Sequence, residues 1–519
     1  MSRRTALTLF TACWAAACGG AAPSPEASTA SAPRHRQLLV VVDGLRPDYV
    51  TEDVMPRLTA LGRRGVVFTR HHSVYPTVTR VNASSIATGS YPERHGLLGN
   101  TVFFPSVDSA RFLDTSDRGA LLRVAEAEGH LLTAPTMGES LQAAGLRMLV
   151  TSSGSSGSAF LNNPTLAGGA ILHYEYVLPE SMAADMQVLG PAPADDAVDG
   201  SLDGYAIDAF LRVGLPKVDP SVTVIWLSDL DTAAHAHGMG SPEAVDTLRR
   251  VDAGLGRIED ALRDAGLLDT YDIWVTSDHG FSTYTGAVDL RAVLAPFMGT
   301  LADGTPRVVA GGGAIYVRDG DEAAVAGIVR ALQWSTGVGA IFTAGASPDT
   351  LEGHVPGTLS FHAARWQHPR AAQILYSPDW TDAANAAGVR GTTSSNGVAG
   401  HGSSSPWDVH NTLIAAGPDL RQGQTVDVPT SNADLAPTFL TLLGLPVPPT
   451  MQGRVVEDGL AGDRPASRVV TDEHTVRRED GSYSVTAMIS TVESGGREYT
   501  YFDGTRVTRI LPPAASRPR

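Results

Sequence analysis

Five short segments of the chain carry residue types that bind divalent metal ions or attack phosphorus. The segments contain Asp43 followed by Gly44; Thr79 and Arg80 within Tyr75 to Asn82; Asp231 and His235; Asp278 and His279, flanked by Ser277 and Gly280; and His401 between Gly400 and Gly402. Each is weak evidence alone, because an Asp-Gly pair is usually a turn and a single His is more often solvated than a ligand. Together, three Asp and three His provide the hard oxygen and borderline nitrogen ligands that two divalent ions need, with Zn²⁺ as the first candidate.

The spacing within the segments indicates how the ligands are shared. Asp231 and His235 are one helical turn apart and can face the same ion, whereas Asp278 and His279 are adjacent and have to diverge. Thr79 precedes a predicted helix over 80–88, whose amide end favours negative charge. A Thr hydroxyl becomes a good nucleophile only when it is activated, for example by metal coordination. The alternative is that Thr79 is a helix N-cap.

The segments follow the elements that have to position them. Short apolar runs, typical of strands buried on both faces, occur at 38–42, 147–151, 222–227, 273–276 and 412–416. Helical patterns lie between them, at 241–265 and 433–443 among others. Strands alternating with helices predict an α/β fold of three layers, with a mostly parallel central sheet. Asp43, Asp231 and Asp278 fall at or just beyond the carboxyl ends of strands, where functional groups collect in such sheets.

In this order, the five segments resemble the type I phosphodiesterase and nucleotide pyrophosphatase branch of the alkaline phosphatase superfamily, over roughly residues 38–455. The resemblance implies an alkaline-phosphatase-like fold and a phospho-threonine intermediate on Thr79. It assigns one ion to Asp43, Thr79, Asp278 and His279, and the other to Asp231, His235 and His401. It also implies that Asn100 donates a hydrogen bond to a phosphoryl oxygen; the alternative is a turn residue after Gly99.

The charge balance favours a phosphodiester substrate. Two divalent ions, three Asp ligands and a Thr alkoxide sum to about zero, which suits a monoanionic diester better than a monoester. The stretch 151–157, where monoesterases of the superfamily would carry a cation, has none. Arg80 could supply that charge by binding a phosphate or carboxylate of the substrate, or it could be solvated. It stands where nucleotide-cleaving relatives often carry an aromatic residue, so nucleotide preference stays open. The alternatives are a phosphomonoesterase or phosphonate hydrolase on the same metals, and then a lipid-anchored binding protein without catalysis.

The N-terminus has the pattern of an export signal. Arg3 and Arg4 precede an apolar run over 6–17, which ends at Cys18. Residues 1–18 therefore read as a signal peptide with a lipoprotein cleavage site at Cys18, and residues 19–36 as a flexible tether. We expect a periplasmic or cell-envelope lipoprotein, or alternatively a secreted protein. The catalytic domain is predicted over 37–458, with a cap or insertion within 282–397, and a small β-rich extension over 459–519. Within the extension, turn signals at Asp480-Gly481, Gly495-Gly496 and Asp503-Gly504 separate the predicted short strands.

Composition limits the partners. The formal net charge is −16 over 519 residues, and no basic stripe is present, which disfavours a nucleic-acid scaffold. A small phosphate ester is the expected substrate, and membrane attachment is expected only through the N-terminal lipid. Cys13 and Cys18 are the only cysteines, so a chain beginning at Cys18 forms no internal disulfide. The sequence leaves the oligomeric state open.

Overall fold

The computed structural model describes residues 34–166, 168–194, 200–347, 349–464 and 466–510. Residues 35–519 form one compact unit by themselves. The proposed signal peptide, Cys18 and almost all of the proposed tether lie outside the described residues. Within the described ranges, no helix is both long and apolar enough to cross a membrane.

A large sheet in the order β20-β2-β19-β9-β1-β8-β5-β6-β7 forms the middle of the fold, with β21 paired to β2. The strands are β1 (Arg36–Val42), β2 (Val66–His72), β5 (Met148–Ser152), β6 (Ala170–His173), β7 (Val177–Leu178), β8 (Val222–Leu227), β9 (Tyr271–Thr276), β19 (His410–Ala416), β20 (Gln424–Val426) and β21 (Thr430–Ser431). The five predicted strands correspond to β1, β5, β8, β9 and β19. Strands β9, β1, β8, β5 and β6 are mutually parallel, whereas β19 runs antiparallel to both of its neighbours.

Alternation along β1 explains the three layers. Leu38, Val40 and Val42 belong to one buried cluster, and Leu39 and Val41 belong to another. Because successive side chains of a strand point to opposite faces, each face of the sheet needs its own cover. The predicted three-layer α/β class is therefore confirmed, and it agrees with the fold of the structural neighbours described below.

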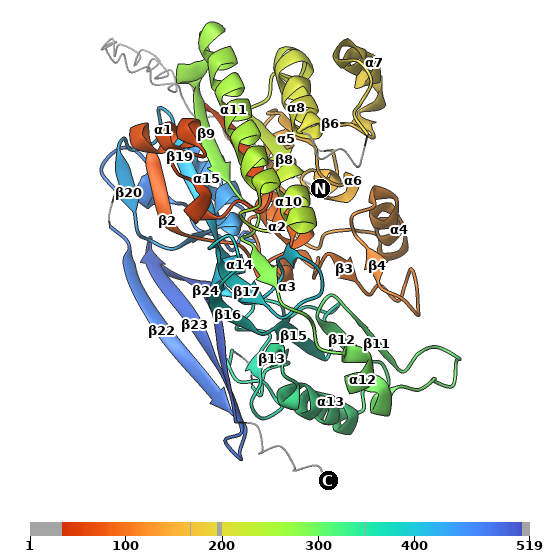
Figure 1. Cartoon of the computed structure of the whole chain (residues 1–519). Helices are drawn as coiled ribbons and strands as arrows, with labels where there is room; N and C mark the ends of the chain where they lie inside the picture. The colour runs from red at the N-terminus through yellow and green to blue at the C-terminus, as the bar shows by residue number, and fades with distance from the viewer. Residues whose placement is uncertain (1–33, 167, 195–199, 348, 465, 511–519) are drawn as a thin grey trace, which may run out of the picture. The chain divides into compact units, whose positions relative to one another are not determined.

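Helices of two groups cover the two faces. The first group is α1 (Pro56–Arg64), α8 (Ser201–Asp208), α10 (Asp229–His237) and α11 (Pro242–Asp264). The second is α2 (Thr79–Thr88), α4 (Arg118–Glu128), α5 (Met137–Ala143), α6 (Ser156–Leu161) and α15 (Leu435–Leu442). Figure 1 shows α11 and α10 lying across the strands on one face. Ser241 caps α11 by accepting a hydrogen bond from the peptide nitrogen of Ala244, so the helix begins at Pro242, one residue after the start of the predicted pattern.

Two smaller sheets occupy the stretch 282–400. One has the order β16-β17-β10-β18 and the other β11-β12-β15-β13-β14. Their strands are β10 (Ser282–Tyr284), β11 (Val308–Gly311), β12 (Ala314–Val317), β13 (Val338–Thr343), β14 (Leu359–Ser360), β15 (Ile374–Pro378), β16 (Trp380–Ala384), β17 (Arg390–Thr393) and β18 (Ala399–Gly400), accompanied by α12 (Leu290–Leu294) and α13 (Glu322–Trp334).

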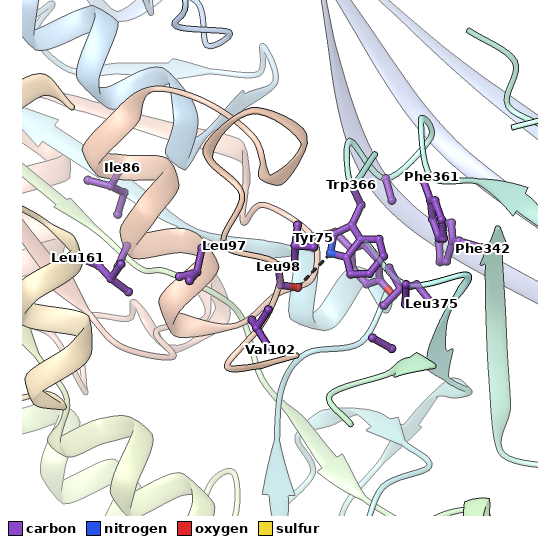
Figure 2. Close-up of a cluster of buried hydrophobic side chains, with 14 of the residues drawn as sticks. Tyr75, Ile86, Leu97, Leu98, Val102, Leu161, Phe342, Phe361, Trp366 and Leu375 are labelled. Carbon is purple, nitrogen blue, oxygen red and sulfur yellow. Dashed lines mark hydrogen bonds between the residues drawn. The ribbon is translucent and has the colours of Figure 1, made fainter. Parts of the chain in front are cut away.

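The segment 282–397, which the sequence predicts to hold a cap or insertion, shares the hydrophobic core of the α2 side of the main sheet. Figure 2 shows Trp366, Phe361 and Phe342 next to Tyr75, in one cluster that continues to Ile86 of α2. The Trp366 indole donates a hydrogen bond to the Leu98 carbonyl oxygen at 3.0 Å. This packing fixes the insertion next to the loop that carries Asn100.

A three-stranded antiparallel sheet ends the described chain, with β22 (Arg468–Arg477), β23 (Tyr483–Ser494) and β24 (Arg497–Arg509). Predicted turn signals at Asp480-Gly481 and Gly495-Gly496 fall between these strands. The turn predicted at Asp503-Gly504 is wrong. The pair lies within β24, where Met488 opposes Gly504 and Ile489 opposes Phe502, so Asp503 is the extra residue of a β-bulge.

Candidate active site

The carboxyl ends of three neighbouring strands deliver the acidic residues. Asp43 directly follows β1, Asp278 comes two residues after β9, and α10 begins two residues after β8 and carries Asp231 and His235. Gly44 permits a close approach here. Its φ is +77°, and a Cβ at this position would come within 2.9 Å of the Phe281 ring. The chain can therefore turn at Asp43 and keep its carboxylate under the loop that holds His279.

Three carboxylate oxygens in this site have no hydrogen-bond partner in the described part of the chain. They are Asp43 Oδ1, Asp231 Oδ1 and Asp278 Oδ2, and all three are buried. The other oxygens of two of these groups are held: Asp43 Oδ2 accepts from the Trp226 indole at 3.0 Å, and Asp278 Oδ1 accepts from the Gly44 peptide nitrogen at 3.2 Å. Buried carboxylate oxygens without partners are costly, and a cation removes that cost. The residues present therefore fit a metal site.

Three histidine nitrogens face these oxygens. His279 Nε2 lies 3.1 Å from Asp278 Oδ2 and 3.3 Å from Asp43 Oδ1. Asp231 Oδ1 lies 3.4 Å from His235 Nε2 and 3.6 Å from His401 Nε2. The structure thus brings together the six Asp and His residues predicted as ligands. Asp231 lies within 4.8 Å of ligand atoms of His235 and His401 on one side and of Asp43 and His279 on the other.

Backbone carbonyls fix the tautomer of all three rings. His235 Nδ1 bonds to Ala399 O at 2.8 Å, His279 Nδ1 to Gly280 O at 2.9 Å and His401 Nδ1 to Thr77 O at 2.9 Å. A carbonyl oxygen only accepts, so Nδ1 carries the proton in each ring and Nε2 of the neutral ring offers its lone pair. This is the arrangement in which an imidazole binds a metal ion through Nε2.

The two groups of ligands differ in depth. The side chains of Asp278 and His279 are fully buried, whereas that of His235 is 41% exposed. We call Asp43, Asp278 and His279 the inner cluster, and Asp231, His235 and His401 the outer cluster. The outer cluster is the part of the site that solvent reaches.

The pKa shifts show how strongly the inner groups interact. Burial raises the pKa of Asp278, and the charge of Asp43 contributes, so that it stands at about 7. Burial lowers the pKa of His279, but the carboxylates of Asp278 and Asp43 outweigh this and hold it well above its ordinary value. Burial lowers the pKa of His401 well below its ordinary value, and the charges on His279 and His235 lower it further. A positive charge among the inner carboxylates is therefore stabilised. Protonated His279 supplies it here, and a metal ion would supply it when bound.

Thr79 is the first residue of α2, one residue earlier than the predicted helix start. The N-cap is Val78, and no side chain caps the helix, so the reading of Thr79 as the cap is wrong. Its Oγ1 instead lies 3.3 Å from His279 Nε2, at the edge of the inner cluster. A hydroxyl at the helix start and next to the carboxylates is placed where an activated nucleophile is needed.

Asn100 and Arg80 lie beside Thr79. The Arg80 peptide nitrogen donates to Asn100 Oδ1 at 3.0 Å, which leaves the Asn100 amide NH₂ as the free donor end. The Arg80 side chain is only 16% exposed, its Nε has no hydrogen-bond partner within the described ranges, and Asp114 is 3.8 Å away. Burial lowers its pKa, which the charges of Asp114, Asp43, Asp231 and Asp278 oppose. The solvated alternative for Arg80 is therefore wrong.

A cavity of about 260 Å³ opens next to these residues. Asn100, His401 and Gly402 line it on one side, and Leu375, Tyr376 and Pro378 from the insertion line it on the other. Its wall combines apolar side chains with the polar residues Thr101 and Ser395, so it can receive a substituent of a substrate bound at Thr79.

Several residues that support the site were missed from the sequence. Trp226 holds Asp43, and the Asn432 amide donates to the Asp278 carbonyl oxygen at 3.0 Å. Asp203 accepts from the Ser153 hydroxyl at 2.6 Å and from the Ser228 peptide nitrogen at 3.0 Å, directly behind the strand end that leads to Asp231. A Trp within the apolar run 222–227 was the one available signal, since a buried indole N–H needs an acceptor.

Comparisons with known proteins agree on one family. A family model described as "Type I phosphodiesterase / nucleotide pyrophosphatase" matches residues 37–387. The chain is 25% identical over 245 residues to ectonucleotide pyrophosphatase/phosphodiesterase family member 1 of Rattus norvegicus, which covers 47% of this chain and 24% of that protein. It is also 25% identical over 256 residues to the venom phosphodiesterase of Macrovipera lebetinus, covering 47% of this chain and 25% of that protein. The chain thus spans about a quarter of the length of these relatives.

Solved structures show the same fold. Murine ectonucleotide pyrophosphatase / phosphodiesterase 5 superposes with a TM-score of 0.59 at 18% identity, covering 82% of this chain and 100% of that one. The same murine protein, as an inactive threonine-to-alanine variant in complex with AMP, gives a TM-score of 0.58 at 19% identity, with the same coverage.

Proposed function

The chain belongs to the type I phosphodiesterase / nucleotide pyrophosphatase family, and on that premise we propose that it is an exported, metal-dependent phosphodiesterase that hydrolyses small phosphate esters through a covalent intermediate on Thr79. One observation carries the proposal: three carboxylate oxygens without hydrogen-bond partners in the described ranges, three imidazole Nε2 atoms and the Thr79 hydroxyl converge at one edge of the central sheet. A murine protein of similar fold is inactive when one of its threonines is replaced by alanine, and Thr79 is the threonine that this chain places next to His279.

The inner cluster with Thr79 would hold one ion, and the outer cluster the other. When bound, the two ions, for which Zn²⁺ fits the ligand set, would supply positive charge to the phosphoryl oxygens and favour the ionised forms of the attacking hydroxyl and of water. All three Nε2 atoms are available because the Nδ1 protons are held by backbone carbonyls.

The reaction uses the chain's own groups in two steps. Thr79 Oγ1 attacks phosphorus, the bond from phosphorus to the leaving alcohol oxygen breaks, and the proton lost from Thr79 ends on that alcohol through solvent. Water then attacks phosphorus, the Thr79–phosphorus bond breaks, and the Thr79 hydroxyl regains a proton. The NH₂ of Asn100 donates to a non-bridging oxygen, with its orientation fixed by the Arg80 peptide nitrogen. The start of α2 adds a favourable field for the phosphoryl charge.

A second candidate activity rests on Arg80. Its side chain is mostly buried, its Nε has no hydrogen-bond partner among the described residues, and its ion pair with Asp114 is long, at 3.8 Å. It could pair with the extra charge of a phosphomonoester or of a second phosphate on the substrate. The cavity beside Asn100 favours the diester, because the second substituent of a diester would occupy it.

Parallel assays with a bis-aryl and a mono-aryl phosphate, with and without chelator, test the proposal. We expect the diester to be hydrolysed at least a hundredfold faster, and chelator to abolish both activities. Faster hydrolysis of the monoester would establish the second candidate, and full activity in chelator would contradict the metal role.

A further inference from the structure

A second group of metal-ligand side chains lies where the C-terminal sheet meets the central sheet, apart from the two catalytic clusters. It consists of His72 of β2, His410 of β19 and Asp503 of β24, each with one ligand atom within 4.8 Å of the others. The three residues come from three strands that are far apart in sequence. We propose that His72, His410 and Asp503 bind a third divalent transition-metal ion, which links the C-terminal sheet to the central sheet.

The two histidines are held side by side by strand register. His72 and His410 are directly opposite in the antiparallel pair of β2 and β19, and their ring centroids are 4.6 Å apart. Directly opposed residues of an antiparallel pair have their Cβ atoms about 4.5–5.5 Å apart, which suits two imidazoles that share one ion. His72 Nδ1 bonds to the Thr430 carbonyl oxygen at 2.9 Å, so Nε2 is the ligand atom, as in the catalytic histidines.

The third ligand is aimed by the β-bulge of β24. Asp503 is the extra residue of that bulge, and bulges often redirect a side chain towards a site. Its Oδ1 lies 2.8 Å from His72 Nε2, while the Ser490 hydroxyl donates to Oδ2 at 2.6 Å and holds the carboxylate in place. The His72 side chain is 1% exposed and that of Asp503 10%. A lone pair on His72 Nε2 this close to a carboxylate oxygen needs a cation between them, either a proton or a metal ion.

The donor set suits a transition-metal ion. Two histidines and one carboxylate are ligands that Zn²⁺ and similar ions prefer, and a water would complete the coordination. His72, but neither His410 nor Asp503, also lines a cavity of about 220 Å³, together with residues of 282–397 and of the C-terminal sheet. Arg70 competes weakly, because its guanidinium lies 3.5 Å from Asp503 Oδ1 and bonds to the Ser490 hydroxyl at 2.5 Å.

Metal counting on the full chain tests this inference. After equilibration with Zn²⁺ and removal of free ion, we expect elemental analysis to find three equivalents in the parent and two in His410→Asn and in Asp503→Asn. His362 lines the same cavity as His72 but is not part of the triad, so His362→Asn should keep three zinc equivalents. Diester hydrolysis should stay within about twofold of the parent in all three variants.

The same experiment separates this inference from the proposed function. If the catalytic metal sites are assigned wrongly, the zinc content of the parent and of His410→Asn would fall by the same amount. Zinc binding by the triad is measured by the difference in zinc content between the parent and His410→Asn. If the Asp503 variant does not fold, the His410 variant still tests the inference, because residue His410 is half-buried whereas Asp503 is buried. Equal zinc content in the parent and in His410→Asn would overturn the inference.

Discussion

Trp226 offers a sharp test of how the inner cluster is assembled. Its indole donates to Asp43 Oδ2 at 3.0 Å, while Asp43 Oδ1 is left for the ion. In Trp226→Phe, Oδ2 would keep only the Ser228 hydroxyl, at 3.5 Å. A hydrogen bond to a charged group contributes about 1.5–3 kcal/mol. Loss of a group that orients a metal ligand typically lowers metal affinity about 10- to 100-fold, which corresponds to about 1.4–2.7 kcal/mol.

The chain contains a matched control for this change. Trp274 is also fully buried in the central sheet, and its indole donates to Gln37 Oε1 at 2.9 Å, away from the metal ligands. Trp274→Phe removes a comparable volume and a hydrogen bond to a neutral acceptor, which contributes about 0.5–1.5 kcal/mol. Both variants should therefore lose stability in urea unfolding, and Trp274→Phe should lose somewhat less.

Zinc affinity should distinguish the two variants. In a competitive titration with a chromophoric chelator, we expect Trp226→Phe to bind the inner ion 10- to 100-fold more weakly than the parent, and Trp274→Phe to bind it within twofold. Excess Zn²⁺ should restore most of the diesterase activity of Trp226→Phe. Equal zinc affinity in the two variants would refute the assignment in which Asp43 Oδ2 is held by Trp226 and Asp43 Oδ1 binds the ion.

Three further predictions follow from burial and charge. Burial, together with the charge of Asp229, raises the pKa of Asp203 to about 8, above its ordinary value of 3.8. Between these two pH values the folded state therefore binds a proton that the unfolded state lacks. The stability that this group contributes is lost as pH rises from about 4 through about 8. Asp203→Asn should remove this dependence and be more stable than the parent at pH 9, and a parallel decline of both proteins in thermal unfolding between pH 6 and 9 would contradict the assignment. Because His235 is 41% exposed while His279 is buried, graded chelation should remove the outer ion first. Activity should then be lost before most of the fall in melting temperature. Simultaneous loss of both ions would contradict this order. Arg80→Gln should slow monoester hydrolysis about tenfold more than diester hydrolysis, since a charged hydrogen bond is lost, and equal effects on kcat/KM for both substrates would remove Arg80 from substrate recognition.

The parts of the fold that obey simple periodicity could be predicted from the sequence. The apolar runs became β1, β5, β8, β9 and β19 within two residues at each end, and Asp43 and Asp278 follow strands as expected. A continuous apolar run such as 38–42 is typical of a parallel strand that is buried on both faces. The segments within 282–397 could not be assigned, because short strands rich in Gly and Ala carry little periodic signal.

Long-range contacts account for what the sequence could not show. Asp503-Gly504 has the composition of a turn, and only pairing with β23 turns it into a bulge. The burial of Arg80 depends on Asn100 and Asp114, and the support of Asp43 by Trp226 depends on the pairing of β1 with β8. The antiparallel direction of β19 likewise depends on its neighbours rather than on its own residues.

The central claim is that Thr79 carries the phosphoryl group during turnover. Acid quenching within the first turnovers of a bis-aryl phosphate, followed by mass spectrometry of the digested chain, measures this directly. We predict an aryl-phosphoryl adduct on the peptide that contains Thr79, and no adduct and no turnover in Thr79→Ala with its metal content near that of the parent. Activity of Thr79→Ala within tenfold of the parent, or an adduct on another residue, would contradict the account.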